Sequence, residues 1–181
     1  MRPEAKLAGT LIRDARPEDV DALVALSRKT FRDKFGHIYR PEDLNAYLEQ
    51  AHTPDFYRTA ILDPDYLVRV AAAEDGSLGA YLVCCPLELP ADAPAPGAVE
   101  LMRVYVDAPL QGRKLGTAFV EESFAWARER EAPEIYLSVF SENDRARRLY
   151  ERFGFEKVGE FWFPVGEHRD REFLMRMSLT A

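Results

Sequence analysis

The chain has 181 residues, carries a formal net charge of -7 at pH 7, and is 47% apolar. This length and composition allow a sizeable buried core, so we expect one domain over residues 1–181. The acidic balance disfavours a nucleic-acid partner, and no apolar run reaches the length of a signal peptide or a membrane span. We therefore expect a cytoplasmic protein that binds neither nucleic acid nor membrane.

The cysteine and histidine positions do not indicate a metal site. The only cysteines, Cys84 and Cys85, are adjacent in an apolar run and would point to opposite faces of a strand. The histidines, His37, His52 and His168, show no ligand spacing with each other or with the cysteines. We expect buried reduced thiols and no metal.

Strand and helix patterns alternate along the N-terminal half. Proline followed by acidic residues marks a helix start at both Pro17 and Pro41. Two later apolar runs, joined by the turn residues 74–77, predict a hairpin. In chain order we expect a flexible tail (1–8), a strand (10–16), a helix from Pro17, an aromatic connector (31–39), a helix from Pro41, and two paired strands (66–73 and 78–85).

Residues 86–97 hold four prolines, a composition that resists regular structure. Neither flank could form an independent domain, so we expect a surface loop here and no domain boundary. Beyond the loop we expect a strand (99–106), a helix (114–131), a strand (134–140), a helix (143–153) and two strands (155–163 and 171–179). The strand, helix, strand order over residues 99–140 implies two parallel neighbours, whereas the hairpins imply antiparallel ones. The fold class is therefore α/β with a mixed sheet.

The helix over residues 114–131 carries two apolar stripes. One stripe suits the core and contains Leu115, Ala118, Phe119 and Trp126. Val120 and Phe124 lie roughly opposite. Another part of the fold, or a second subunit in a homodimer, would have to cover them.

The segment from Gln111 to Ala118 has the features of an anion-binding loop. It lies where a strand passes into a helix, whose first N–H groups lack intrahelical partners and carry the positive end of the dipole. Gly112 and Gly116 allow the backbone to approach a ligand closely, and Arg113 and Lys114 add positive charge. The alternative is a tight turn with an incidental basic pair.

The helix over residues 143–153 predicts a polar face that can look into a cleft. Asn143, Ala146, Arg147 and Tyr150 fall near one face, beside an apolar stripe. Asn143 could cap the helix or bind a ligand amide. Tyr150 could be a core tyrosine or could supply a proton to a departing thiolate.

These segments together resemble the acetyl-CoA-binding core of the GNAT N-acetyltransferases. The resemblance rests on Val104-Tyr105-Val106, on the loop from Gln111 to Ala118, and on Asn143 to Tyr150 followed by Gly154-Phe155. One departure is Lys114, which stands where the family pattern has its first glycine. The resemblance implies the GNAT fold, in which flanking helices cover a mixed, mostly antiparallel central sheet and one parallel pair splays around the cofactor.

The resemblance also implies roles for the residues. An amine would attack the thioester of acetyl-CoA directly in a ternary complex, with no metal. Backbone groups of Val104 and Val106, and the side chain of Asn143, would bind the pantetheine arm. Tyr150 would be the acid and Glu100 the base, unless Glu100 is instead a surface or salt-bridged residue, paired for example with Arg103. The pyrophosphate would lie on the loop residues Gln111, Gly112, Arg113, Lys114, Leu115, Gly116 and Thr117.

The acceptor is expected to be a small-molecule amine or a protein amine. Residues 30–48 resemble the corresponding stretch of the PaiA-type polyamine acetyltransferases, which makes a polyamine the leading acceptor. The alternatives are a protein N-terminus or lysine, another small amine, or a regulatory module that binds CoA without catalysis. The expected acceptor residues are Phe31, Phe35, Tyr39 and Glu42, with Trp162 on the opposite wall beside Phe161 and Phe163.

Overall fold

The computed structural model describes residues 2–180, in which eight strands form one mixed sheet of order β1-β2-β3-β4-β5-β6-β8-β7. Every neighbouring pair is antiparallel except β5 and β6. The fold class expected from the sequence is confirmed. The strands are β1 (Ala5–Leu7), β2 (Thr10–Asp14), β3 (Leu67–Ala72), β4 (Leu78–Pro86), β5 (Val99–Val106), β6 (Glu134–Phe140), β7 (Glu156–Val165) and β8 (His168–Ser178).

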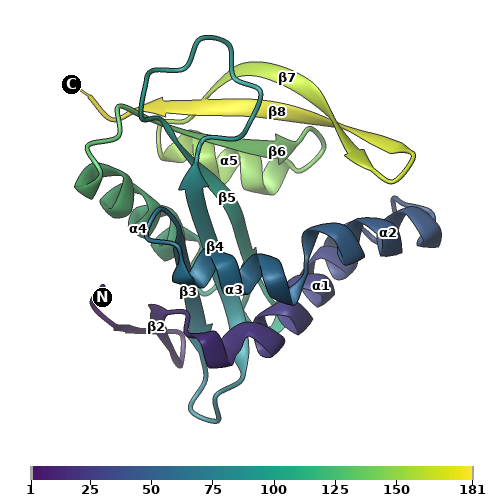
Figure 1. The fold of residues 1–181 in the computed structure, drawn as a ribbon, viewed down its shortest axis with the longest axis vertical. Helices are drawn as coiled ribbons and strands as arrows, with labels where there is room; N and C mark the ends of the chain where they lie inside the picture. The colour runs from purple at the N-terminus through teal and green to yellow at the C-terminus, as the bar shows by residue number, and fades with distance from the viewer. Residues whose placement is uncertain (1, 181) are drawn as a thin grey trace.

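Helices cover both faces of the sheet (Figure 1). They are α1 (Val20–Phe35), α2 (Pro41–Ala51), α3 (Pro54–Leu62), α4 (Leu115–Glu129) and α5 (Asp144–Arg152), with short 3-10 turns at Pro17–Asp19 and Ala108–Leu110. Helix α4 packs on β3, β4 and β5 from one side, and α1 packs on β4 and β5 from the other. Within residues 2–180, no helix is both long enough and apolar enough to cross a membrane.

Three local expectations differ from the structure. The tail expected over residues 1–8 includes β1, which pairs with β2, while Met1 lies outside the described residues. The aromatic connector begins later than expected because α1 continues to Phe35. Helix α3 was not expected at all, although Thr53 caps it by accepting a hydrogen bond from the Phe56 N–H and Pro54 occupies its first turn.

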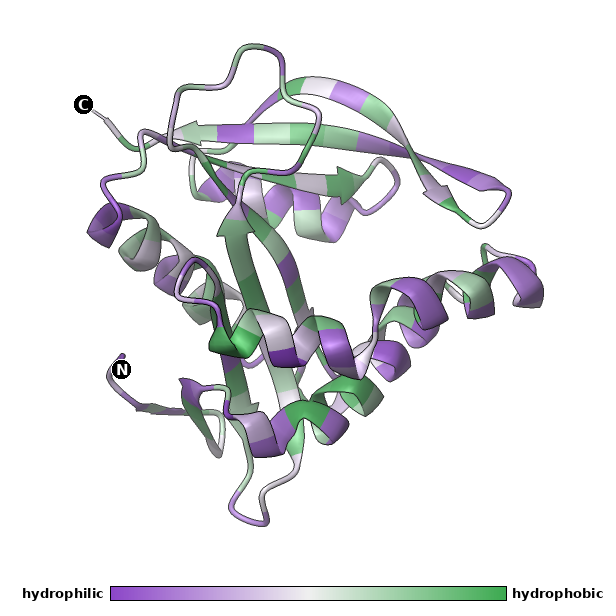
Figure 2. Ribbon diagram, in the orientation of Figure 1, coloured by the Kyte–Doolittle hydropathy of each residue, from purple (hydrophilic) through white to green (hydrophobic). Residues whose placement is uncertain are grey.

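The apolar residues concentrate in the centre of the sheet, where β4 is hydrophobic along most of its length (Figure 2). The second stripe of α4 is buried within the same chain. Val120 is fully buried, and the Phe124 ring centroid lies 5.6 Å from that of Phe153 and 5.7 Å from that of Phe155. No second subunit is therefore needed to cover this stripe. The expected loop is confirmed over residues 87–97, which contain no helix or strand, whereas Pro86 is the last residue of β4.

The tip of the β7–β8 hairpin docks on the start of α2. The Glu167 N–H donates to Asp43 Oδ1 at 2.8 Å, and Arg40 forms ion pairs with both Asp43 and Glu167. Gly166 has φ +60°, and a Cβ there would lie only 2.2 Å from Asp43 Oδ1. The hairpin can therefore reach α2 only because this position is glycine.

A buried guanidinium ties the sheet to α4. Arg69 on β3 is 1% exposed and donates to Glu122 of α4 at 2.6 and 3.1 Å and to Asp14 of β2 at 2.8 Å. Its remaining polar contact is with the Pro3 carbonyl at 2.8 Å. Such a buried charge is stable only while its partners are present.

We expect Glu122→Ala to lower the free energy of unfolding by about 2–3 kcal/mol, because Arg69 loses its bidentate partner but keeps Asp14. Urea denaturation would measure the change. The matched control is Glu121→Ala, which removes the exposed neighbouring carboxylate that forms no ion pair within residues 2–180. Equal effects of the two substitutions would contradict this account of Arg69.

Candidate active site

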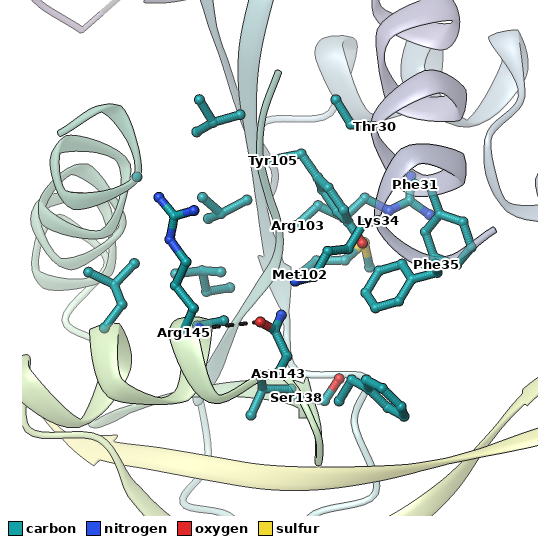
Figure 3. A pocket seen from close by; sticks show the side chains of 18 of the residues that line it. Thr30, Phe31, Lys34, Phe35, Met102, Arg103, Tyr105, Ser138, Asn143 and Arg145 are labelled. Atoms are coloured by element: carbon teal, nitrogen blue, oxygen red, sulfur yellow. Dashed lines mark hydrogen bonds between the residues drawn. The ribbon is translucent and has the colours of Figure 1, made fainter. Parts of the chain in front are cut away.

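The parallel strands β5 and β6 separate soon after they meet. Their pairing is limited to Val99 with Ile135 and Glu100 with Tyr136. Beyond these pairs the strands diverge, and a continuous cleft of about 1220 Å³ extends between them, from α1 and α2 on one side to α4 and α5 on the other. Figure 3 shows Asn143 and Arg145 on one wall of this cleft and Phe31 and Phe35 on the other.

The divergence leaves one edge of β5 without a partner strand. The Asp107 N–H donates to the Gly79 carbonyl at 2.8 Å, so in this antiparallel register Val106 and Val104 turn their N–H and C=O groups away from β4. Both residues line the cleft. The Val106 carbonyl already accepts from Gln111 Nε2 at 3.1 Å, which leaves its N–H available. A bulge at Met102, which has no partner on β4, bends the strand beside these groups.

The loop before α4 presents unpaired backbone donors to the cleft. The first intrahelical bond runs from the Ala118 N–H to the Lys114 carbonyl, so the N–H groups of Leu115, Gly116 and Thr117 have no partner inside the helix. No side chain among residues 2–180 caps this end. Gly112 and Lys114 both adopt left-handed backbone conformations, with φ of +79° and +66°. These residues line the cleft, and free N–H groups at the start of a helix are what an anion-binding site requires.

The loop side chains are not all equally placed. Gln111 and Lys114 line the cleft, whereas Arg113 is exposed and does not line it. Gln111 Oε1 accepts from Arg145 Nη1 at 3.2 Å, which connects the loop to α5. Three arginines of α5 that the sequence analysis missed also line the cleft, and their spacing places them near one helical face: Arg145, Arg148 and Arg152.

Asn143 begins α5 and lines the cleft. Its Oδ1 accepts from the Ala146 N–H at 3.4 Å, so the expected capping role is confirmed as a long hydrogen bond. The amide nitrogen has no hydrogen-bond partner within residues 2–180. It can therefore donate to a ligand without loss of the cap.

Tyr150 projects from α5 into the same cleft and is 8% exposed. Its ring meets Phe155 edge to face, with centroids 5.8 Å apart. Burial, together with the nearby negative charge of Glu172, raises the pKa of the phenol. Tyr150 therefore keeps its proton at neutral pH, as a proton donor must.

Glu100 lies at the closed end of the cleft and is 5% exposed. Burial raises the pKa of its carboxyl to about 7, although the N–H groups of Glu88 and Leu89, which donate to Oε2 at 3.0 and 3.1 Å, oppose the shift. Glu100 thus also anchors the loop over residues 86–97. It forms no ion pair with Arg103, whose guanidinium instead donates to Tyr57.

A second carboxyl in the cleft was missed by the sequence analysis. Glu172 on β8 lies opposite Phe140 of β6 and lines the cleft. Burial raises the pKa of Glu172 to about 7, the Ser138 hydroxyl opposes this shift, and Asp170 adds to it. The C-terminal run of residues 171–179 predicted a strand, but only the sheet order shows that this strand faces the cleft. Glu172 is therefore a second candidate base, and its negative charge contributes to the raised pKa of Tyr150.

Aromatic side chains of α1 and the following turn form the wall of the cleft on which the acceptor was expected. Phe31, Phe35 and Tyr39 are buried in one cluster, and all three line the cleft as expected. The Tyr39 hydroxyl donates to Asp170 Oδ2, which fixes the end of α1 against β8. Burial, with Asp170 close by, raises the pKa of Tyr39.

The structure does not bring Glu42 or Trp162 to the cleft. Glu42 is exposed because the next residue, Asp43, occupies the inner face of α2, where it holds the β7–β8 tip. Trp162 is 65% exposed because strand alternation turns it away while its neighbours, Phe161 and Phe163, line the cleft. Phe163 instead packs against Tyr47 inside the cleft, with ring centroids 5.8 Å apart.

Known proteins resemble this chain in sequence and in fold. The chain is 28% identical over 177 residues to an uncharacterized N-acetyltransferase of Lactobacillus delbrueckii subsp. lactis, an alignment that covers 96% of this chain and 100% of the relative. The solved structure of the PaiA N-acetyltransferase from Thermoplasma acidophilum, in complex with coenzyme A, superposes with a TM-score of 0.75. That match has 19% identity and covers 92% of this chain and 97% of the other.

A shorter match concerns a polyamine enzyme. The spermine/spermidine N(1)-acetyltransferase of Bacillus subtilis is 40% identical over 68 residues, which cover 37% of this chain and 45% of that protein. The family model described as the acetyltransferase (GNAT) family matches residues 22–155. This match spans most of the chain, from α1 through α5. The chain therefore belongs to the GNAT family of acetyltransferases.

Proposed function

We propose that this protein transfers the acetyl group of acetyl-CoA to a primary amine of a small molecule by direct attack in a ternary complex. The observation that carries the proposal is a single cleft that joins a phosphate-type anion site to a buried phenol and two carboxyls with pKa values of about 7. When bound, acetyl-CoA supplies the activated acetyl thioester. The acceptor supplies the amine, and the groups that bind both substrates and move protons can come from side chains and backbone of this chain.

The described residues fit coenzyme A in two places. The unpaired N–H groups at the start of α4, with Lys114 beside them, suit the pyrophosphate. The open edge of β5 suits the pantetheine amides, because Val104 and Val106 turn backbone groups toward the cleft in the manner of a strand that lacks its neighbour. Asn143 can donate to the same arm from the opposite wall.

Two proton transfers accompany the exchange of a thioester for an amide. A carboxylate would first take one proton from the ammonium group so that nitrogen can bond to the acetyl carbon. As the carbon–sulfur bond breaks, Tyr150 Oη would donate its proton to the sulfur, and the second proton that nitrogen then loses would restore the phenol through solvent. Glu172 is the carboxylate we favour, because its charge acts on Tyr150 and because Glu100 Oε2 already accepts two backbone hydrogen bonds. Glu100 is the alternative base.

A polyamine is one candidate acceptor. Aromatic faces together with the cleft carboxyls of Asp170 and Glu172 suit a long cation, and the partial match to the Bacillus subtilis enzyme supports the same class. A protein N-terminus or lysine is a second candidate, since GNAT enzymes also act on protein amines. The buried, unpaired thiols of Cys84 and Cys85 fit the cytoplasmic location expected from the sequence.

The activity test is release of free CoA thiol from acetyl-CoA in the presence of a panel of polyamines, amino acids, other small amines and N-terminal peptides. We expect turnover with at least one small amine, and we expect Tyr150→Phe to lower kcat by about 100-fold with little change in the KM for acetyl-CoA. Tyr136→Phe is the matched control, because Tyr136 is equally buried but does not line the cleft. Binding of acetyl-CoA without turnover on any amine would instead favour a regulatory module.

The pH profile of kcat/KM separates the two candidate bases. In the native protein we expect the rate to rise with pH through about 7, because a carboxyl with a raised pKa must lose its proton before it can act as a base. Glu172→Gln should remove this rise and lower the rate at neutral pH, whereas Glu100→Gln should preserve it. The opposite pattern would assign the base to Glu100.

Lys114 provides a test of the anion site. Its left-handed backbone is unfavourable for a residue with a Cβ, so Lys114→Gly should raise the free energy of unfolding by about 0.5–1 kcal/mol relative to Lys114→Ala. Both substitutions remove the charge and should raise the KM for acetyl-CoA by about fivefold. Thermal denaturation and steady-state kinetics would measure the two effects. A KM that stays unchanged in both variants would place the pyrophosphate elsewhere.

A further inference from the structure

The acceptor side of the cleft contains a cation that no carboxylate of the described chain neutralises. Arg103 on β5 lines the cleft, where it lies between Met102 and Tyr105 and beside α1 (Figure 3). Its Nη1 donates to Tyr57 Oη at 2.9 Å and its Nη2 donates to the Ala51 carbonyl at 2.8 Å. Within residues 2–180 it forms no ion pair. A half-buried guanidinium without an anion is costly unless a ligand supplies one.

Protein contacts hold the guanidinium of Arg103 in place without a ligand. Its guanidinium lies 4.4 Å from the centroid of the Phe56 ring and 5.6 Å from that of Tyr57, in cation–π contact with both. Of the five N–H groups of an arginine, two are used by the hydrogen bonds to Tyr57 and Ala51. The others have no acceptor in the described part of the chain. A fixed fork with free N–H groups loses little entropy when it binds a planar oxyanion.

A histidine beside Arg103 provides a second donor. Tyr57 Oη accepts from Arg103 and lies 3.3 Å from His52 Nδ1, within hydrogen-bond distance. Burial, with Arg103 and Arg28 nearby, lowers the pKa of His52 to about 2, so the ring is neutral. In the tautomer whose Nδ1 accepts from Tyr57, the proton of the ring is on Nε2. His52 lines the cleft, and Nε2 is buried without a hydrogen-bond partner in residues 2–180. Arg103, Tyr57 and His52 thus form a hydrogen-bonded network, at the end of which Nε2 of His52 is free to bind a ligand.

This pair of donors is separate from the phosphate site. Arg103 is held by groups of α2 and α3, whereas Lys114 and Arg145 stand at α4 and α5 across the cleft. The carboxyls of Glu172 and Asp170 line the same cleft. The acceptor side therefore offers positive and negative groups together. A purely cationic acceptor would satisfy the carboxyls but be repelled by Arg103.

We propose that the acceptor is an amine that also carries a carboxylate, as an amino acid does, and that Arg103 and His52 bind this carboxylate while the amine lies toward Glu172. The inference rests on the proposed acetyl transfer and narrows its acceptor. Guanidinium and carboxylate match in shape and can share two hydrogen bonds. A hydrogen bond to a charged group of this kind discriminates by roughly 10- to 100-fold.

The test compares acceptors that differ only in this charge. A panel of amino acids, each assayed beside its own carboxamide, isolates the carboxylate, and cadaverine serves as lysine without its carboxyl group. We expect kcat/KM for at least one amino acid to exceed that of its carboxamide by roughly 10- to 100-fold. Isothermal calorimetry of the same pairs with the CoA-bound protein gives a second readout that does not depend on turnover.

Variants then assign the preference to Arg103. Arg103→Met should bring the amino acid down to the level of its carboxamide while the carboxamide changes much less, and Arg103→Lys should preserve part of the preference. The control is Arg28→Met, because Arg28 Nε donates to the His52 carbonyl at 2.9 Å but the side chain does not line the cleft. Arg28→Met should leave the ratio unchanged.

The outcomes separate this inference from the proposed function. Equal rates for amino acids and carboxamides, or a preference for cadaverine over lysine, would overturn the role of Arg103 while leaving amine acetylation intact. Equal losses for both acceptors in Arg103→Met would show a structural role only. If no amine is acetylated, the proposed function fails, and the calorimetric comparison still decides whether Arg103 binds a carboxylate.

Discussion

The parting of β5 from β6 is the constraint on which the rest of the structure depends. Two parallel residue pairs hold the strands together, and beyond them both strands lose their shared hydrogen bonds. A buried strand edge is normally unfavourable because its N–H and C=O groups are left unpaired. Here the edge faces a cleft instead of the core, so a ligand that runs along β5 can replace the missing strand. The bulge at Met102 and the docking of the β7–β8 tip on α2 keep the opening in place.

Several locally unfavourable features gather around this opening. Lys114 adopts a left-handed conformation, Arg103 has no protein anion, and His52 Nε2 has no hydrogen-bond partner among the described residues. Each of these would reduce stability if it were incidental. Elsewhere, ordinary packing and the paired charges around Arg69 provide the stability that such a site requires. These unfavourable conformations and unpaired polar groups lie where a bound ligand would contact them.

The sequence predicts what depends on near neighbours. The strands on either side of α4 and the Asn143 cap follow from local patterns and are confirmed. The loop before α4 lies where it was expected, and its role in binding an anion stays a prediction. Glu172, Arg103 and His52 could not be assigned to the cleft, because the pairing of β8 with β6 and the packing of α2 and α3 on β5 bring them there. The prediction that Glu42 and Trp162 face the cleft was wrong for a simpler reason. A shift of one residue along a helix or strand reverses which side chain faces inward.

The net charge of the chain gives little guidance to the acceptor. Specificity depends on the few charges that line the acceptor wall, and these have both signs: Glu172 and Asp170 on β8 face the same space as Arg103 on β5. Burial increases the effect of these charges on binding, because charges interact more strongly in a partly buried cleft than on the surface. If a ligand leaves Arg103 unpaired, the unfavourable free energy of burying its guanidinium remains. A zwitterionic amine pairs with the guanidinium and with the carboxyls at once. The acceptor best suited to this wall therefore carries a negative group that pairs with Arg103 and a positive group that pairs with Glu172 and Asp170.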